Sequence, residues 1–236
     1  MDRVEKIERY LRAHLAAEGS GGAPGYRPSS HAFVTISRQS GTGAHALAES
    51  IVSIFDDQED SATFGGWRVY DRTICDLVSR DPRFSRSLDA LLEEEYRAKS
   101  SNMFHQLITA SADQGAVMNR AFLVVRAIAG MGKAIIIGRG GSQVTRDMPH
   151  GVSMRLVSGK TDRMSAAMKR FNLNEREAKA EIKRRDASRQ RMIKDKFGVD
   201  ISDPREYDVT WNVGSATHAE IAHAVTELVR SRAASG

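Results

Sequence analysis

From residue 32 onward, short apolar runs alternate with longer stretches whose apolar residues recur at helical spacing. The short runs predict strands at 32–37, 67–70, 134–137, 152–157 and 207–211. The longer stretches predict helices over 44–55, from about Thr73, and over 160–171, 174–195 and 217–232, while 81–131 shows helical periodicity alone. Strands that alternate with helices in this way are typical of an α/β fold with a parallel sheet covered on both faces. In such sheets ligands bind at the carboxyl ends of the strands.

The beginning of the chain carries a separate pattern. One apolar stripe of an amphipathic helix is formed by Val4, Ile7, Leu11 and Leu15. A segment rich in Gly, Ser and Pro follows it. We therefore expect an N-terminal helix (1–18), a flexible linker (19–31) and one α/β domain (32–236). The stripe needs a surface to pack on, and either the body of the same chain or a second copy in a homo-oligomer would provide one.

Composition limits the class of protein. Hydrophobic residues make up 41% and charged residues 28% of the 236, as in ordinary soluble domains. The single cysteine, Cys75, excludes an internal disulfide and a cysteine-based zinc site, and a lone thiol suits a reducing compartment. No apolar run reaches the ~18 residues of a membrane helix, and no apolar signal segment begins the chain. We expect a cytoplasmic protein without a membrane partner.

The positive charge is concentrated in one segment. The formal net charge is +5, and residues 160–196 alone hold 13 Lys or Arg against 6 Asp or Glu. Such a field attracts nucleotide phosphates or nucleic acid, although a solvated helical face has the same composition. The only aromatic residues that could stack on bases are Phe171 and Phe197, which directly follows the segment. Nucleic acid is therefore the least favoured of these partners.

A glycine-rich turn joins the first strand to the first helix. Backbone N–H groups of Ser40, Gly41, Thr42 and Gly43 at such a turn, together with the helix N-terminus, would bind phosphate. In a complete P-loop a lysine and a Ser or Thr follow the last glycine, and here Ala44 and His45 hold those positions. An ordinary βα turn is the alternative interpretation.

Polar residues also follow the second and third strands. Asp71 would bind a substrate group or a metal-bound water, or else cap the next helix. Arg72 beside it is placed for a phosphate. Arg139 follows the third strand within Gly138-Arg139-Gly140-Gly141, where a planar guanidinium suits a phosphate. A surface ion pair is the alternative for Arg139.

The basic segment contains one further cluster. Arg185 and Arg189 share a helix face, and Asp186 is placed to orient one of them. Several guanidiniums on a mobile helix would close over a transferring phosphoryl group. A solvated basic helix is the alternative. No histidine or carboxylate pattern identifies a metal site, so the metal ligands stay open.

Taken in order, these segments resemble the cytidylate kinase-like family, a branch of the nucleoside monophosphate kinases, over about residues 32–230. The matching segments are 36–39 with 41–43, 70–72, 137–140, 162–163, 184–189, and 207–208 with Asn212. The resemblance implies a P-loop NTPase-type fold, with a five-stranded parallel sheet and helices on both faces. It also implies a helical insert that binds the monophosphate (72–131) and a short arginine-rich lid (about 184–204).

The same resemblance implies an activity and a set of roles. The activity is transfer of the γ-phosphoryl group of ATP, with Mg²⁺, to CMP, dCMP or a similar small phosphate acceptor. The residues implied at ATP are Ser40, Gly41, Thr42, Gly43 and Arg185. Those implied at the acceptor are Asp71, Arg72, Arg139 and Arg184. Asp186 and Arg189 would act on the transferring group, and Arg38 is our candidate to replace the charge of the missing lysine.

The sequence also departs from the classical cytidylate kinases. Besides Ala44, three positions differ: Ile137 and Gly140 stand where the classical enzymes have aspartates, and Ile182 where they have an arginine. The kinase-like branch commonly lacks the lysine as well. Three hypotheses remain, namely a nucleoside monophosphate kinase, a non-catalytic nucleotide-binding module and a nucleic-acid binder. The missing lysine favours the module, and the Asp186–Arg189 pair favours the kinase.

Overall fold

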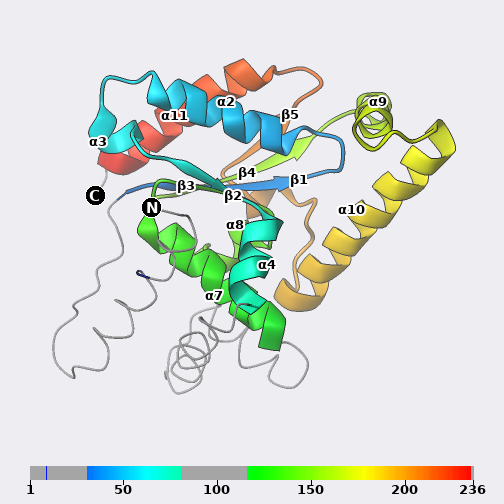
Figure 1. The fold of residues 1–236 in the computed structure, drawn as a ribbon, viewed down its shortest axis with the longest axis horizontal. Helices are drawn as coiled ribbons and strands as arrows, with labels where there is room; N and C mark the ends of the chain where they lie inside the picture. Colours follow the sequence, from blue (N-terminus) through cyan, green and yellow to red (C-terminus); the bar gives the residue numbers. More distant parts are fainter. Residues whose placement is uncertain (1–8, 10–30, 81–115, 235–236) are drawn as a thin grey trace.

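The computed structural model describes residues 9, 31–80 and 116–234 (Figure 1). The expected N-terminal helix and linker lie outside this part, apart from Arg9 and His31. So does the middle of the expected insert, 81–115. Within the described segments no helix is both long and apolar enough to span a bilayer.

One parallel sheet forms the centre of the molecule. Its five strands are β1 (Phe33–Arg38), β2 (Arg68–Tyr70), β3 (Ala134–Ile137), β4 (Gly151–Val157) and β5 (Val209–Asn212). They are ordered β2-β3-β1-β4-β5 and every pairing is parallel. The predicted α/β class and the five strands are therefore confirmed. The last strand begins two residues later than predicted, because Tyr207 still belongs to the end of a 3₁₀ turn, η1 (Pro204–Glu206).

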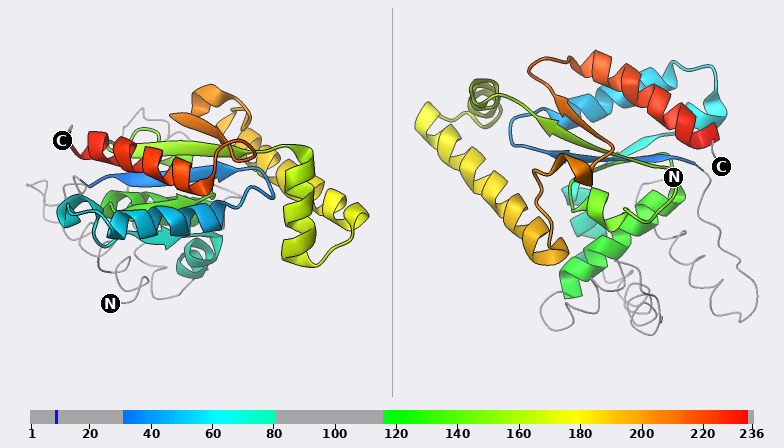
Figure 2. Two further views of the ribbon diagram at one scale, coloured as in Figure 1. Left: turned by 90° about the horizontal axis from the view of Figure 1, so that it is seen from above. Right: turned by 180° about the vertical axis from the view of Figure 1, so that it is seen from behind.

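Helices cover both faces of this sheet (Figure 1). One face carries α2 (Ala44–Asp56), α11 (His218–Ala234) and the short α3 (Ser61–Phe64). The other carries α4 (Arg72–Arg80), α7 (Ala116–Met131) and the short α8 (Gly141–Val144). The helices α9 (Lys160–Phe171) and α10 (Glu175–Phe197) extend beyond the sheet in every view (Figure 2).

Burial on both faces explains why the strands appear as unbroken apolar runs. All four residues of β3 are buried, as are the first four of β1. Val34 and Ile36 pack with α2 and α11, whereas Phe33 packs with α7 on the opposite face. This is the pattern that a parallel sheet between two helical layers requires.

The helix α10 is capped at both ends and buries few apolar residues. A reciprocal capping box between Asn174 and Glu177 begins it, and Gly198 ends it in the left-handed conformation. Its first half packs on α9 through Ala178 and Ile182. Because Ile182 is buried in that small cluster, its apolar side chain serves the packing of α9 on α10. The range expected for the lid, 184–204, comprises the second half of this continuous helix and the loop and turn that follow.

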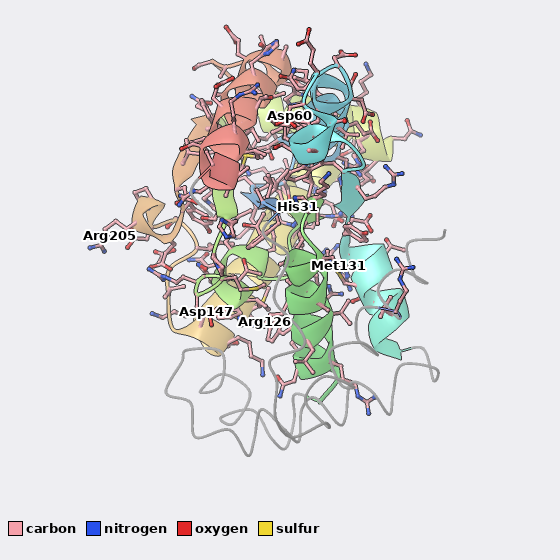
Figure 3. The ribbon with its side chains drawn as sticks, turned by 90° about the vertical axis from the view of Figure 1, so that its left-hand side faces the viewer. His31, Asp60, Arg126, Met131, Asp147 and Arg205 are labelled. Atoms are coloured by element: carbon pink, nitrogen blue, oxygen red, sulfur yellow. The ribbon has the colours of Figure 1, made fainter. Side chains whose placement is uncertain are left out.

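An ion pair fastens the short helix α8 to α7. Arg126 Nη1 donates to the carbonyl of Val144 at 2.8 Å and to Asp147 Oδ1 at 2.6 Å, and Figure 3 shows Arg126 and Asp147 side by side. All four residues of α8 are buried. The ion pair thereby holds the C-terminal end of α8 against α7.

The packing of α2 on the sheet gives the first prediction. Leu47 is fully buried in the core cluster between α2, α11 and the sheet. We expect Leu47→Ala to lower the free energy of unfolding by about 2–5 kcal/mol, because it leaves a cavity in this core. Urea unfolding measures the change. Ser53→Ala, at an exposed position of the same helix, should change it by less than about 0.5 kcal/mol. Equal midpoints for the two variants would contradict the packing.

Candidate functional site

Two adjacent cavities open at the carboxyl end of the sheet. The first, which we term the turn cavity, has a volume of about 410 Å³ and includes Arg38–His45, Asp162, Arg185 and His218 in its wall. The second, the β3 cavity, has a volume of about 340 Å³ and includes Ser37, Arg72, Gly138–Gln143 and Tyr207. Arg38 and Arg189 belong to both walls. The two spaces therefore meet at a pair of arginines.

The glycine-rich turn approaches α9 very closely. Gly41 has φ +88°, and a Cβ at this position would lie 2.6 Å from the carbonyl oxygen of Arg163. Gly43, also in the left-handed conformation, is the N-cap of α2. The turn thus presents backbone at a helix N-terminus to the cavity, which is the arrangement that binds phosphate.

The side chains that follow the turn explain part of the departure from a complete P-loop. Thr42 is 2% exposed and its hydroxyl donates to the carbonyl of Gln39 at 2.9 Å, so only its backbone faces a ligand. Ala44 is buried in the core cluster beneath α2. His45 Nε2 lies 3.4 Å from Asp71 Oδ2. Asp71 also accepts the N–H of Thr73 at 2.9 Å, so the capping interpretation of Asp71 is confirmed.

The carboxylate of Asp186 ties α10 to the turn. Its Oδ1 accepts the N–H of Ser40 at 2.9 Å, and its Oδ2 accepts a hydrogen bond from Arg163 at 2.6 Å. Arg189 donates to Asp186 as well and to the hydroxyl of Ser40 at 2.5 Å. We term these four residues the Asp186 network. It joins the turn, α9 and α10 through charge-assisted hydrogen bonds, which are stronger than neutral ones.

The surroundings of Asp186 favour its charged form. Burial alone would raise its pKa, but the Ser40 N–H, Arg163 and Arg189 outweigh burial and lower it below its ordinary value. A group with a lowered pKa stabilises the fold above the pKa of the unfolded chain and loses this contribution as the pH falls through the folded pKa. The network therefore persists at neutral pH and weakens only below about pH 4.

Arg38 lies at the boundary between the two cavities. Its guanidinium rests on the end of β3, where a Cβ at Gly138 would be only 1.8 Å from its Nη1. Burial and then the positive charge of Arg189 lower its pKa to about 10, so it stays charged at neutral pH. The guanidinium of Arg38 makes no hydrogen bond or ion pair with the residues that the structure describes, so its donors are available to a ligand.

Arg139 and Arg72 share a carboxylate at the β3 cavity. Arg139 has φ +54° and is 14% exposed, and it pairs with Asp76 of α4. Arg72 donates to the same carboxylate at 3.2 Å. The Nε of Arg139 is buried without a hydrogen-bond partner among the described residues. Asp76 thus holds both arginines against the cavity while leaving part of their donor capacity unused.

The two neighbouring arginines of α10 differ in placement. Arg184 is 68% exposed, bonds to Glu181, and belongs to neither cavity. Arg185 also bonds to Glu181, but it reaches the wall of the turn cavity and lies 4.4 Å from the ring centroid of Phe171. The structure brings Arg38, Arg139, Arg185 and Arg189 to the cavities and leaves Arg184 outside them.

Three site residues are absent from the sequence prediction. Arg163 lies within a segment that matches the family, but the sequence gives it no role. Asp76 lies within α4 without any distinguishing signal. Arg155 is 5% exposed although it is charged, and its Nη1 donates to the hydroxyl of Ser37 at 2.9 Å. An arginine inside an apolar strand was the one signal available for it.

Gln143 has a partly unsatisfied amide in the wall of the β3 cavity. Its Nε2 donates to Glu206 Oε2 at 3.2 Å, and Arg146 donates to the same oxygen at 2.6 Å. The amide oxygen Oε1 is buried and has no hydrogen-bond partner in the part of the chain that the structure describes. An unsatisfied buried acceptor costs about 1–3 kcal/mol.

Comparison with known proteins adds to this geometry. Residues 33–215 match the family model described as the cytidylate kinase-like family. The chain belongs to the cytidylate kinase-like family. Its parallel sheet in the order 2-3-1-4-5, with a glycine-rich turn after β1, is of the P-loop kinase type. The expected family and fold are therefore confirmed.

Solved structures give two further similarities. An uncharacterized protein from Eubacterium ventriosum ATCC 27560 is 19% identical with a TM-score of 0.63, covering 86% of this chain and 99% of that one. It supports the fold alone. Shikimate kinase from Bacteroides thetaiotaomicron is 9% identical with a TM-score of 0.44, covering 84% and 98% of the two chains. A search of curated proteins found no match.

The Asp186 network gives the second prediction. We expect Asp186→Ala to speed hydrogen exchange of the Ser40 amide about ten-fold or more, because the amide loses its charged acceptor and Arg163 and Arg189 lose the carboxylate between them. Exchange followed by mass spectrometry on peptides of the turn measures this. The control is Asp195→Ala, at an exposed position of the same helix. Exchange at Ser40 that is the same in both variants would contradict the network.

Proposed function

We propose that the protein transfers the γ-phosphoryl group of ATP to a nucleoside monophosphate that resembles CMP or dCMP, or to a similar small phosphate acceptor. The observation that carries the proposal is the meeting of the two cavities at Arg38 and Arg189. Phosphoryl transfer needs the attacking oxygen of the acceptor and the leaving oxygen of the donor in line, with cations around the transferring group. Two adjoining spaces with shared arginines suit that requirement.

The turn cavity would hold ATP. A cradle that requires glycine at Gly41 and Gly43 suits phosphate oxygens, and Arg185 adds a cation to its wall. ATP would supply the phosphoryl group that is transferred. The residues fit this ligand, because the backbone of the turn is exposed to the cavity while the Thr42 side chain is turned away from it.

The binding of Mg²⁺ would depend mainly on the nucleotide. Among the described residues no group of three His, Cys, Asp or Glu could hold a metal ion. Mg²⁺ in kinases keeps several waters and binds through substrate phosphates with one or two protein groups. Asp162, which lies in the wall of the turn cavity, is the carboxylate placed for such a contact.

The β3 cavity would hold the acceptor. Arg139 and Arg72 would bind its phosphate, which would compete with the carboxylate of Asp76 for their donors. Arg189 and Arg38 would then neutralise the charge that spreads over the transferring group. Asp186 and Arg163 would act as positioning residues, because they hold Arg189 and the turn in one arrangement.

A non-catalytic nucleotide-binding module is the second candidate. The observation that favours it is Ala44, which leaves the turn without the lysine that reaches the β- and γ-phosphates in complete P-loops. In this case the same cavities would bind nucleotides and no diphosphate would form.

The third prediction separates these candidates. With ATP and Mg²⁺, and CMP, dCMP, UMP, AMP and GMP as acceptors, we expect one monophosphate to be converted to its diphosphate. Arg139→Ala should lower kcat/KM by about 100-fold or more, because it removes a charged donor from the acceptor phosphate. Arg191→Ala, at an exposed position of α10 outside both cavities, is the matched control. Nucleotide-induced thermal stabilisation without any turnover would favour the binding module.

The fourth prediction concerns the replacement of the lysine. We expect Arg38→Met to weaken ATP binding and to lower turnover by about ten-fold or more, since methionine keeps bulk but loses the charge between the cavities. Nucleotide titration by calorimetry and steady-state kinetics measure the two effects. Unchanged affinity together with unchanged turnover would show that Arg38 has no part in replacing the lysine.

A further inference from the structure

An imidazole occupies the position at which a complete P-loop carries a hydroxyl group. In such loops a Ser or Thr follows the lysine and its oxygen binds Mg²⁺, whereas His45 stands there in this chain. The hydroxyl of Thr42 does not replace it, because Thr42 is buried and donates to the carbonyl of Gln39. The start of α2 therefore offers a nitrogen donor where the complete motif offers an oxygen.

Asp71 fixes which nitrogen of His45 carries a proton. Nε2 of His45 lies 3.4 Å from Asp71 Oδ2, and an ionised carboxylate can only accept hydrogen bonds. Nε2 is therefore the protonated nitrogen of the neutral ring, and the lone pair lies on Nδ1. The carboxylate is itself held in place, because its Oδ1 accepts the backbone N–H of Thr73 at 2.9 Å. A carboxylate behind a histidine is the usual arrangement at protein metal sites, where it orients the ring and raises its basicity.

The side chain of His45 is accessible at the turn cavity. His45 belongs to the wall of this cavity and its side chain is 39% exposed. Nδ1 makes no hydrogen bond with the residues that the structure describes. This nitrogen is one bond further from the backbone than the hydroxyl oxygen of a Ser or Thr would be. A metal ion on it would therefore lie in the same region of the cavity as the ion of a complete P-loop.

An imidazole nitrogen changes which cation is favoured. Mg²⁺ prefers oxygen ligands, whereas imidazole suits first-row transition ions, for which affinity rises from Mn²⁺ through Co²⁺ to Ni²⁺. Among the described residues no three His, Cys, Asp or Glu side chains could form a closed site. Most ligands of the ion would therefore be phosphate oxygens of a nucleotide and water, and the position suits a metal–nucleotide complex rather than a structural ion.

We propose that Nδ1 of His45 binds the divalent ion that accompanies the nucleotide, and that this ion is a first-row transition ion such as Co²⁺ or Zn²⁺ in preference to Mg²⁺. The proposal rests on the binding of a nucleoside di- or triphosphate in the turn cavity, which the kinase and the binding module share. Asp71 is a positioning residue in it, since it acts on the ion only through the tautomer of His45.

The first test compares two metal complexes of one nucleotide. Binding of ADP to the untagged full chain is measured by calorimetry, with Mg²⁺ or Co²⁺ at concentrations that saturate the nucleotide. The Co²⁺ complex should bind about ten-fold tighter or more than the Mg²⁺ complex. His45→Ser restores the hydroxyl of the complete motif. It should remove this preference by weakening the Co²⁺ complex, while the Mg²⁺ complex binds at least as tightly as before.

The second test detects the metal–nitrogen bond itself. Pulsed electron paramagnetic resonance of the bound Mn²⁺–ADP complex should show coupling to nitrogen when the histidines of the protein are labelled with ¹⁵N. The label separates them from the nitrogens of the nucleotide. His45→Ser should abolish the coupling. Asp71→Asn should weaken it and lower Co²⁺–ADP affinity by about ten-fold, because an amide that donates to Nε2 moves the ring proton to Nδ1.

The control is His223→Ser, at an exposed position of α11 outside both cavities, which should preserve the preference and the coupling. If His45→Ser fails to fold, Asp71→Asn decides between the outcomes.

Three results would overturn the proposal. These are equal binding of the two metal complexes without nitrogen coupling, coupling that survives His45→Ser and disappears in a variant of His218, the other histidine of this wall, and no binding of ADP with either metal. The last result would also contradict nucleotide binding in the proposed function. Because ADP is measured without an acceptor, coupling at His45 in a protein that forms no diphosphate would contradict the kinase activity alone.

Discussion

The arrangement of the site depends on one carboxylate, that of Asp186. The positive charges of Arg189 and Arg139 lie close enough to Arg38 to lower its pKa together with burial, and like charges in a partly buried site repel strongly. Asp186 offsets this by accepting from Arg189, from Arg163 and from the backbone of the turn. Three elements that are far apart in the sequence are thereby drawn to one point. At the β3 cavity, Asp76 pairs in the same way with Arg139 and Arg72.

The helix α10 connects several parts of the site. The helix is bound to α9 near its beginning, to the turn at its centre, and to α7 at its end through the rings of Phe197 and Phe122, whose centroids are 5.5 Å apart. A movement of α10 away from the sheet would separate Arg189 from both cavities and also release Ser40. A ligand whose entry displaced α10 would therefore also change the geometry of the turn.

The strands and long helices were predictable because burial produces regular apolar spacing, and the family followed from the order of the short polar segments. The sequence could not predict α3 and α8, which are too short to show a helical period. Nor could it predict partnerships between distant positions, such as Arg163 with Asp186 or Arg139 with Asp76. The sequence also could not predict that Arg185 reaches a cavity while Arg184 does not. Adjacent residues of a helix point about 100° apart, and the sequence does not say which of the two faces the site.

The absence of the P-loop lysine can be understood from the position of Arg38. In a complete P-loop the lysine at the position of Ala44 reaches the phosphates of the nucleotide from the start of the helix. Arg38 comes instead from the end of β1, between the cavities, and its guanidinium fits there because residue 138 is glycine. On the proposed function, this moves one positive charge from the ATP side to the boundary across which the phosphoryl group passes. On the same proposal, a charge at that boundary would contact both phosphates in turn. The absence of the P-loop lysine is then compatible with transfer.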